Sequence, residues 1–375
     1  MDALVEYPQP WILPENGPFS RVPSRPPVHR QRGFDEQFDS KTVFYDCVYV
    51  KDGGAIVLQG PPFLNLKRHL RHFWASDPCG REELKASMRE ADRHAQIWVT
   101  AGRPIEAVRF LSELGEIELQ VNADRNEFFR GTRVLLTVSK NNRLDWICDW
   151  IRFHRDVHGA NAVLLYDNSS TEYDLNELMS RLRTIPSIDR LCVVSWPFKY
   201  GPGGRRGFWD SDFCQYGALE NAKWRFLQKA KSVLSCDIDE LVVTRGKSVF
   251  ELAELSGQGY VNFHGKWVVG VDEDSSGPNP LMVRHADFRY ARSRDRCPTK
   301  WAAVPSRCPK TAQWRVHLIG IGINEVAPST ACYRHFRQIN THWKYDRSGR
   351  DKFDPARHYL DEELEAALQK VRWDR

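Results

Sequence analysis

The chain has 375 residues, of which 41% are hydrophobic and 27% are charged. This length allows one large domain and a smaller one, and the composition excludes a chain that is disordered throughout. The formal net charge is +5, and the basic residues are spread out rather than gathered in one run, which argues against a dedicated nucleic-acid-binding protein. No apolar run reaches the roughly 18 residues of a membrane span and residues 1–6 lack the features of a signal peptide, so we expect a cytoplasmic protein.

The N-terminal third carries no recognisable chemistry. Residues 1–33 are rich in proline, which sustains neither a helix nor a central strand, and so they predict an extended arm. Residues 34–130 predict a smaller accessory module of strands and helices. Its predicted elements are a hairpin over 42–58, helices over 81–95 and 104–114, and a strand over 117–121.

From residue 131 onward, buried strands and amphipathic helices alternate, a pattern typical of βαβ units in an α/β fold. Polar segments follow three of the predicted strands, at 140–143, 167–170 and 237–240. Because ligand-binding groups gather at the carboxyl ends of parallel strands, the pattern predicts one polar crevice that contains all three. The predicted strands are 133–138, 162–166, 191–196 and 233–239, and the predicted helices are 144–158, 175–182, 213–230 and, in a C-terminal tail over 347–375, 361–375.

The stretch 232–243 is the strongest candidate for chemistry. Apolar residues lead into Asp237, Asp239 and Glu240, and then Leu-Val-Val resumes the apolar pattern. If the strand continues through these acids, Asp237 and Asp239 share one face and can bind one divalent cation, while Glu240 points elsewhere. The simpler interpretation is a solvated acidic turn between two strands.

A cation held by two carboxylates favours a diphosphate as the ligand, because Mg²⁺ and Mn²⁺ prefer oxygen ligands and bridge phosphate oxygens. Asp167 and Asn168, after an earlier strand, offer hydrogen bonds to a base or a ribose. The same two residues also fit a turn that starts the next helix, and both interpretations can hold at once.

Several motifs in order resemble nucleotide-sugar glycosyltransferases of the GT-A fold, in the branch similar to family 2 and to family 92 (the former domain of unknown function 23). The similarity covers about residues 132 to 346. The motifs are Lys140-Asn141-Asn142, Asp149 to His154, Gly159, Tyr166 to Ser170, Gln215, Asp237-Ile238-Asp239-Glu240, Lys300-Trp301, Val316-His317, Arg334 to Arg337 and His342 to Tyr345.

This resemblance implies a Rossmann-like, mostly parallel sheet flanked by helices in a domain over 131–346. It also implies a nucleotide-sugar donor, a Mn²⁺ or Mg²⁺ ion and a hydroxyl acceptor. The expected metal ligands are Asp237, Asp239 and His317. The alternative interpretation of His317 is a histidine packed in the core, and His335 is then the other candidate for the third ligand. The expected donor-binding residues are Lys140, Asn141, Asp167, Asn168, Gln215 and Asp237.

The general base is harder to assign. In this fold it follows the metal motif, so Asp287 is the first candidate, and Asp272, Glu273 and Asp274 come next. The alternative for Asp287 is a salt-bridged surface residue, and the alternative for residues 272–274 is a solvated loop. Asp149 stands where the family has Glu, and it is either catalytic or an anchor for its helix. The glycine-rich segment 201–207 fits either a mobile lid or a surface loop.

The leading hypothesis is a metal-dependent glycosyltransferase of polysaccharide or glycolipid biosynthesis. Its acceptor would be a glycan or a glycolipid, and it would be cytoplasmic, with peripheral association at the inner membrane face left open. One alternative is a nucleotidyltransferase or another phosphoryl-transfer enzyme, although Ser139 to Asn142 is not a glycine-rich phosphate loop. The other is a non-catalytic sugar-binding protein. Donor sugar, nucleotide base, stereochemistry and oligomeric state stay undetermined by the sequence.

Overall fold

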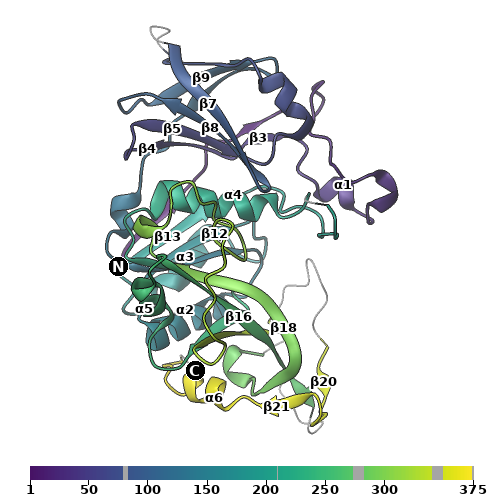
Figure 1. The fold of residues 1–375 in the computed structure, drawn as a ribbon, viewed down its shortest axis with the longest axis vertical. Helices are drawn as coiled ribbons and strands as arrows, with labels where there is room; N and C mark the ends of the chain where they lie inside the picture. Colours follow the sequence, from purple (N-terminus) through teal and green to yellow (C-terminus); the bar gives the residue numbers. More distant parts are fainter. Residues whose placement is uncertain (79–82, 209, 273–282, 340–348, 374–375) are drawn as a thin grey trace. The chain divides into compact units, whose positions relative to one another are not determined.

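The computed structural model describes residues 1–78, 83–208, 210–272, 283–339 and 349–373 (Figure 1). The chain divides into two compact units. The large-sheet unit comprises residues 1–5, 129–194 and 229–375, and the small-sheet unit comprises residues 6–128 and 195–228. The division differs from the predicted boundaries because 195–228 belongs with the N-terminal module, where Trp224 packs edge-on against Trp98 at a centroid distance of 4.8 Å.

The large-sheet unit is built on a ten-stranded sheet in the order β1-β13-β12-β11-β14-β18-β16-β19-β15, with β21 paired to β18. Its helices α2, α3, α5 and α6 contribute apolar side chains to one core with the sheet (Figure 1). The strands are β1 (Asp2–Glu6), β11 (Arg133–Ser139), β12 (Ala162–Asp167), β13 (Arg190–Ser195), β14 (Ser232–Ser235), β15 (Glu240–Thr244), β16 (Tyr260–Val269), β18 (Tyr290–Ala303), β19 (Ala331–Phe336) and β21 (His358–Leu360), with β17 (Val271–Asp272) and β20 (Asp351–Lys352) as a separate pair. The helices are α2 (Leu144–His158), α3 (Leu175–Arg183), α5 (Val249–Leu255) and α6 (Glu362–Leu368).

The strand pairing changes from parallel to antiparallel at β14. β11 runs parallel to β12 and to β14, so Ser139 aligns with Asp167 and Leu136 aligns with Ser235. The ends of these three strands therefore meet at one edge, as the sequence predicted. Beyond β14, the pairs β14–β18, β18–β16 and β19–β15 are antiparallel. In that half of the described sheet, only the pair β16–β19 is parallel. The α/β class with a large sheet is confirmed, but the sheet is mixed rather than mostly parallel.

The predicted strands and helices between residues 133 and 196 are confirmed to within a residue at each end. Helix α2 forms because Ile147, Trp150 and Phe153 repeat on one buried face, and Gly159 ends it in a left-handed conformation with φ of 73°. The strand predicted over 233–239 ends at Ser235, and the C-terminal helix is limited to α6.

The small-sheet unit contains a seven-stranded sheet in the order β10-β9-β6-β7-β8-β5-β4. The predicted hairpin is confirmed by β4 and β5, and helix α4 covers the first part of the helix predicted over 213–230 before a π-helical turn at Ala222–Phe226. Its elements are β2 (Trp11–Ile12), α1 (Phe34–Gln37), β3 (Thr42–Phe44), β4 (Asp46–Val50), β5 (Ala55–Gly60), β6 (Trp74–Ser76), β7 (Glu83–Ala91), β8 (His94–Thr100), β9 (Ala107–Ser112), β10 (Gly115–Gln120) and α4 (Phe213–Asn221), with short 3-10 turns at Pro27–His29, Leu64–Leu70 and Asn126–Phe129.

Two predicted helices in this unit are wrong. The segments 81–95 and 104–114 form strands β7 and β9 instead. Most of β7 is exposed, apart from the buried Leu84, and charged residues recur along it, so its composition is that of a solvated helix. Yet β8 pairs with β7 from Lys85 to Ala91. Tertiary pairing overrides local propensity here. None of the described helices is both long and apolar enough to cross a bilayer.

Candidate functional site

The acidic motif forms a tight turn directly after β14. The Glu240 amide donates to the Asp237 carbonyl at 3.0 Å, and the Asp237 amide donates to the Glu240 carboxylate at 2.8 Å. Within the turn, the side chains of Cys236 and Ile238 are buried, at 1% and 2% exposure, and anchor it in the core. The expectation that Glu240 points elsewhere is therefore wrong, because side chains alternate only while the strand continues, and β14 ends at Ser235.

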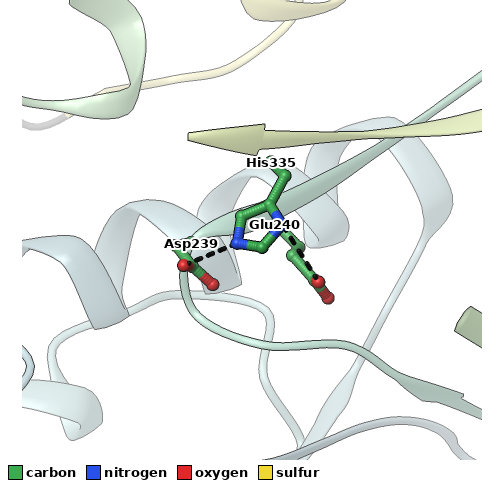
Figure 2. A group of neighbouring side chains, drawn as sticks. All are labelled: Asp239, Glu240 and His335. Carbon is green, nitrogen blue, oxygen red and sulfur yellow. Dashed lines mark hydrogen bonds and ion pairs between the residues drawn. The ribbon is translucent and has the colours of Figure 1, made fainter. Parts of the chain in front are cut away.

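The turn brings two of its carboxylates to a histidine of β19. β19 runs antiparallel to β15, so Glu240 lies opposite His335. His335 Nε2 is 2.9 Å from Asp239 Oδ2, and His335 Nδ1 is 3.9 Å from Glu240 Oε1 (Figure 2). One ligand atom from each of the three residues lies within 4.8 Å of the other two. Two carboxylates and an imidazole form a donor set that suits Mn²⁺ and similar divalent cations.

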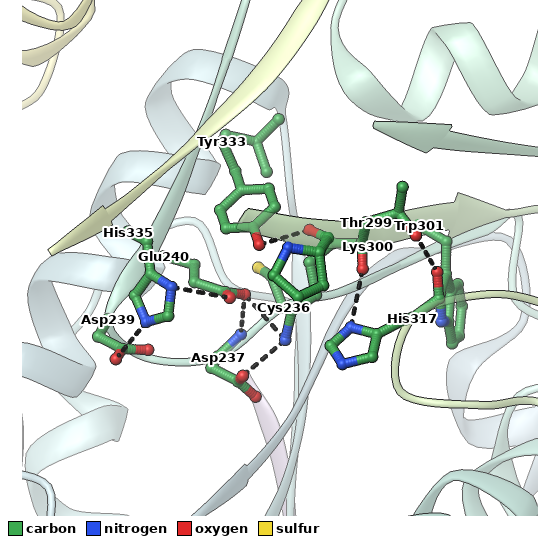
Figure 3. Close-up of polar contacts among 12 residues, drawn as sticks. Cys236, Asp237, Asp239, Glu240, Thr299, Lys300, Trp301, His317, Tyr333 and His335 are labelled. Carbon is green, nitrogen blue, oxygen red and sulfur yellow. Dashed lines mark hydrogen bonds and ion pairs between the residues drawn. The ribbon is translucent and has the colours of Figure 1, made fainter. Parts of the chain in front are cut away.

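Lys300 on β18 supplies a positive charge next to the carboxylates of the acidic turn. Its strand pairs antiparallel with β14, which places Trp301 opposite Ser235. The Lys300 ammonium is 3% exposed and lies 2.6 Å from Asp237 Oδ2 and 3.1 Å from Glu240 Oε2 (Figure 3). The structure thus pairs Asp237 with Lys300, while Asp239 pairs with His335. A buried lysine between two carboxylates offsets charge that would otherwise be costly to bury.

Two groups of the site have strongly shifted pKa values. Burial raises the pKa of Glu240 to about 7, even though Lys300 acts in the opposite direction. For His335, burial favours the neutral ring, but the ion pair with Asp239 more than offsets this and raises the pKa to about 10. His335 is therefore protonated at neutral pH, and a cation that binds its imidazole has to displace that proton.

Trp267 holds the His335 ring in place. It lies on β16, which runs parallel to β19 and aligns Trp267 with His335. The two rings stack with centroids 4.0 Å apart and an interplanar angle of 20°. Since an imidazole binds a cation only along a ring nitrogen, this stacking limits the directions in which His335 can do so.

His317, the predicted third ligand, is not part of this group. It is exposed, and its Nδ1 is 3.0 Å from the Thr299 carbonyl oxygen. Thr299 Oγ1 donates in turn to the His317 carbonyl at 2.6 Å. Figure 3 shows His317 on the far side of Lys300 from His335. The histidine that lies beside Asp239 is therefore His335, the other candidate for the third metal ligand.

The predicted donor side gathers at the ends of β11 and β12. The Asn141 amide donates to Ser170 Oγ at 2.9 Å, and Ser170 Oγ donates to Asp167 Oδ1 at 2.6 Å. The Ser170 amide also donates to Asp167 Oδ2 at 3.1 Å, so the turn interpretation of this segment is correct. Lys140 is half-buried between the two strand ends, and the Asn168 amide donates to the Ser139 carbonyl at 2.8 Å.

Gln215 lies on α4 of the small-sheet unit, where Tyr200 Oη donates to its side chain at 2.7 Å. Its predicted role at the donor site stays a prediction. The glycine-rich segment 201–207 belongs to the same unit, and the buried Arg25 donates to its Gly203 carbonyl at 3.2 Å while pairing with Asp210.

The general-base candidates are only partly placed. Asp287 is exposed and caps a short 3-10 turn (His285–Asp287), since its carboxylate accepts from the Arg284 amide at 2.6 Å. Asp272 lies on β17, and Glu273 and Asp274 fall outside the described residues. Asp149 is 1% exposed and accepts from Arg284 at 2.6 Å, so it anchors α2 to this turn.

Sequence reasoning missed the roles of Lys300 and Glu240. Three carboxylates within four residues, followed at once by a buried Leu-Val-Val run, indicate that a cationic side chain must lie close by. That signal does not say which of the many basic residues it is, because the pairing of β14 with β18 brings together segments about sixty residues apart.

Comparison with known proteins shows what this arrangement belongs to. The model of glycosyltransferase family 92 matches residues 140–371. Among solved structures, the chain is similar to the apo structure of the bifunctional glycosyltransferase WbbM, with 15% identity, a TM-score of 0.26, and coverage of 40% of this chain and 27% of that one. It is also similar to the galactosyltransferase LgtC in complex with donor and acceptor sugar analogues, with 16% identity, a TM-score of 0.25, and coverage of 47% and 58%.

The chain thus spans less than two thirds of the length of either structure. None of the curated proteins compared with it matches. The family model, in contrast, covers well over half of the 375 residues and includes α2, the acidic turn, Lys300 and His335. The chain belongs to glycosyltransferase family 92.

Proposed function

We propose that this enzyme transfers a sugar from a nucleotide-sugar donor to a hydroxyl acceptor, and that it does so with a divalent cation bound by Asp239, Glu240 and His335. The observation that carries the proposal is that one ligand atom from each of these three side chains lies within 4.8 Å of the other two. A solvated acidic turn at the surface would not need a half-buried imidazole on one side and a buried lysine on the other.

The donor side supports the same function. The segments that follow β11 and β12 are linked by Asn141, Ser170 and Asp167, and β11 lies between β12 and β14 in the sheet. A nucleotide that contacts this edge would have its diphosphate next to the acidic turn. The cation, when bound, supplies positive charge that stabilises the leaving diphosphate.

The chain's own residues have separate tasks in this scheme. Lys300 holds Asp237 and Glu240 in position, Trp267 fixes the His335 ring, and Asp167 accepts hydrogen bonds from the donor or from Ser170. Lys140, Asn168 and Gln215 stay candidates for donor contacts, and Asp287 and Asp272 stay candidates for the base that removes the acceptor proton. We extend the proposal to a glycan or glycolipid acceptor in polysaccharide or glycolipid biosynthesis at the cytoplasmic side of a membrane.

Thermal unfolding tests the proposal without knowledge of the sugar or the acceptor. Purified protein is unfolded with UDP, GDP or CDP, each with and without Mn²⁺. A ligand present at about 100 times its dissociation constant adds about 2.7 kcal/mol to the free energy of unfolding. We expect one nucleotide to stabilise the protein only when Mn²⁺ is present, and Asp239→Asn and His335→Gln to abolish that shift.

Asp52→Asn is the matched control, because Asp52 is exposed in the hairpin of the small-sheet unit. It should keep the full nucleotide shift. If no nucleotide diphosphate stabilises the folded wild-type protein, or if Asp239→Asn keeps the Mn²⁺-dependent shift, the proposed donor and cation sites are wrong.

A further inference from the structure

A loop of the large-sheet unit exposes isoleucines that a folded protein normally buries. The segment 318–324 reads Leu-Ile-Gly-Ile-Gly-Ile-Asn and follows a tight turn in which the Arg315 amide donates to the Leu318 carbonyl at 3.0 Å. Ile321 is 95% exposed and Ile323 is 60% exposed. Burial of an isoleucine side chain is worth about 1.5–3 kcal/mol, so this exposure forgoes a substantial stabilisation.

The exposure does not come from a loosely attached loop. Asn324 donates to Ser256 Oγ at 2.9 Å and to the Tyr260 carbonyl at 2.6 Å, and its amide donates to Asn262 Oδ1 at 3.1 Å. Gly322 lies so close to Tyr260 that an added Cβ would be 3.0 Å from its hydroxyl. The backbone is thus fixed against the sheet, and the two isoleucines project from it.

A third exposed apolar side chain lies on the neighbouring element. Leu255 ends helix α5, is 66% exposed, and immediately precedes Ser256, the partner of Asn324. Leu255, Ile321 and Ile323 are called the apolar patch below. The hydrogen bond between Ser256 and Asn324 links the end of α5 to the loop that carries the two isoleucines. Groups of exposed large apolar residues mark contact sites for a partner or a membrane, whereas single exposed residues carry no such meaning.

The surroundings of the apolar patch are basic. Arg307 donates to the carbonyls of Glu254 and Ser256 at 2.7 and 2.6 Å, which places it beside Leu255, and Lys310 is exposed in the same segment. Residues 296–324 contain no aspartate or glutamate. Of the acidic side chains adjoining the patch, Glu254 is ion-paired with Arg133 and Lys231, and Glu325 lies 3.2 Å from His264 Nε2.

We propose that the apolar patch inserts into the interface of an anionic lipid bilayer and holds the enzyme at the membrane surface. Isoleucine and leucine side chains gain by entering the acyl region, and the flanking basic residues gain by approaching anionic headgroups. The exposed basic residues beside the patch, Arg307 and Lys310, complement anionic headgroups, and this favours an anionic bilayer as the occupant. Such a surface would bring the enzyme to a lipid-linked acceptor, but the proposal does not depend on the donor or cation site.

Vesicle sedimentation of the full chain tests this. The wild-type protein is mixed with vesicles of phosphatidylcholine alone or of phosphatidylcholine with phosphatidylglycerol, at low and at high salt. We expect stronger binding to the anionic vesicles, weakened by salt, and a loss of at least tenfold in partitioning for the Ile321→Ser/Ile323→Ser double variant. Val28→Ser is the control, since Val28 is 83% exposed but lies in the small-sheet unit, and it should bind like the wild type.

Unchanged thermal unfolding of the double variant would show that it folds, and Leu255→Ser provides a second variant that leaves the loop intact. The proposal is overturned if the wild-type protein does not sediment with anionic vesicles, or if the double variant and Leu255→Ser both sediment as the wild type does. It is also overturned if the wild type is a dimer in light scattering and the double variant is a monomer, because the patch would then be an interface between two copies.

Discussion

The buried His158 makes a sharp prediction about how stability depends on pH. It is 1% exposed at the end of α2, where its Nε2–H donates to the Val242 carbonyl at 2.6 Å and its Nδ1 accepts from the Val249 amide at 3.3 Å. The second bond requires the neutral ring, because a protonated ring has no acceptor for the Val249 amide. Burial lowers the pKa of His158 from 6.5 to about 4.

The folded-state pKa is thus below the unfolded-state pKa, so the unfolded chain takes up the proton first as the pH falls. The neutral ring contributes its full stability above pH 6.5, and this contribution is lost as the pH falls from 6.5 towards 4. One pKa unit corresponds to 1.36 kcal/mol, so the lowered pKa of His158 accounts for about 3 kcal/mol.

The test compares wild type with His158→Gln, whose side chain keeps one donor and one acceptor but does not titrate. Free energies of unfolding are measured by urea denaturation at a series of pH values from 8 to 4. The advantage of the wild type should be constant above about pH 7 and should fall by about 3 kcal/mol towards pH 4. Contributions from histidines that do not contact His158 are present in both proteins and cancel in the difference. A difference that does not change with pH would refute the assignment of a buried neutral ring.

Three further predictions concern the site. Lys300→Met leaves Glu240 buried without its cation and should cost roughly 3–5 kcal/mol in the free energy of unfolding, whereas Lys247→Met at an exposed position should cost less than about 0.5 kcal/mol; equal costs would contradict the charge pairing. Trp267→Leu removes the ring stacked on His335 and should weaken Mn²⁺ binding several-fold in calorimetric titration while Trp267→Phe keeps part of the affinity; unchanged affinity in Trp267→Leu would rule out a positioning role. Gly265→Ala would place a Cβ 2.3 Å from the Tyr333 ring and should lower stability by roughly 1–3 kcal/mol, unlike Gly257→Ala, where nothing lies within 4 Å; a stable Gly265→Ala protein would mean that Tyr333 moves freely.

The parallel half of the sheet was predictable because each of its elements has a strong local pattern. Val134 to Val138 is apolar apart from Thr137, Ala162 to Tyr166 is a continuous apolar run, and α2 has a clear helical repeat with a glycine stop. The antiparallel half was not predicted, since β16, β18 and β19 carry polar residues at positions that face the protein, among them the buried Lys300 and the half-buried His335. Those residues break the apolar pattern that identifies a strand, and they are also the residues that complete the site.

The candidate site shows the same division. Asp237 and Asp239 were found because they are adjacent in sequence and follow an apolar strand. The choice of His317 over His335 depended on sequence position alone, and only the register of β15 against β19 decides which histidine faces Asp239. For Glu240 the strand geometry was extended past Ser235, where the backbone in fact turns.

The acidic turn lies where parallel strand pairing gives way to antiparallel pairing, and this has a consequence for a truncated chain. The acidic residues come from the turn after β14, whereas the lysine and the histidine that face them come from β18 and β19. A chain that stopped before residue 290 would still carry the complete D-x-D-E sequence, but it would lack both partners. Such a fragment would score as a sugar transferase in a motif search, although its acidic turn would have neither counter-charge nor imidazole.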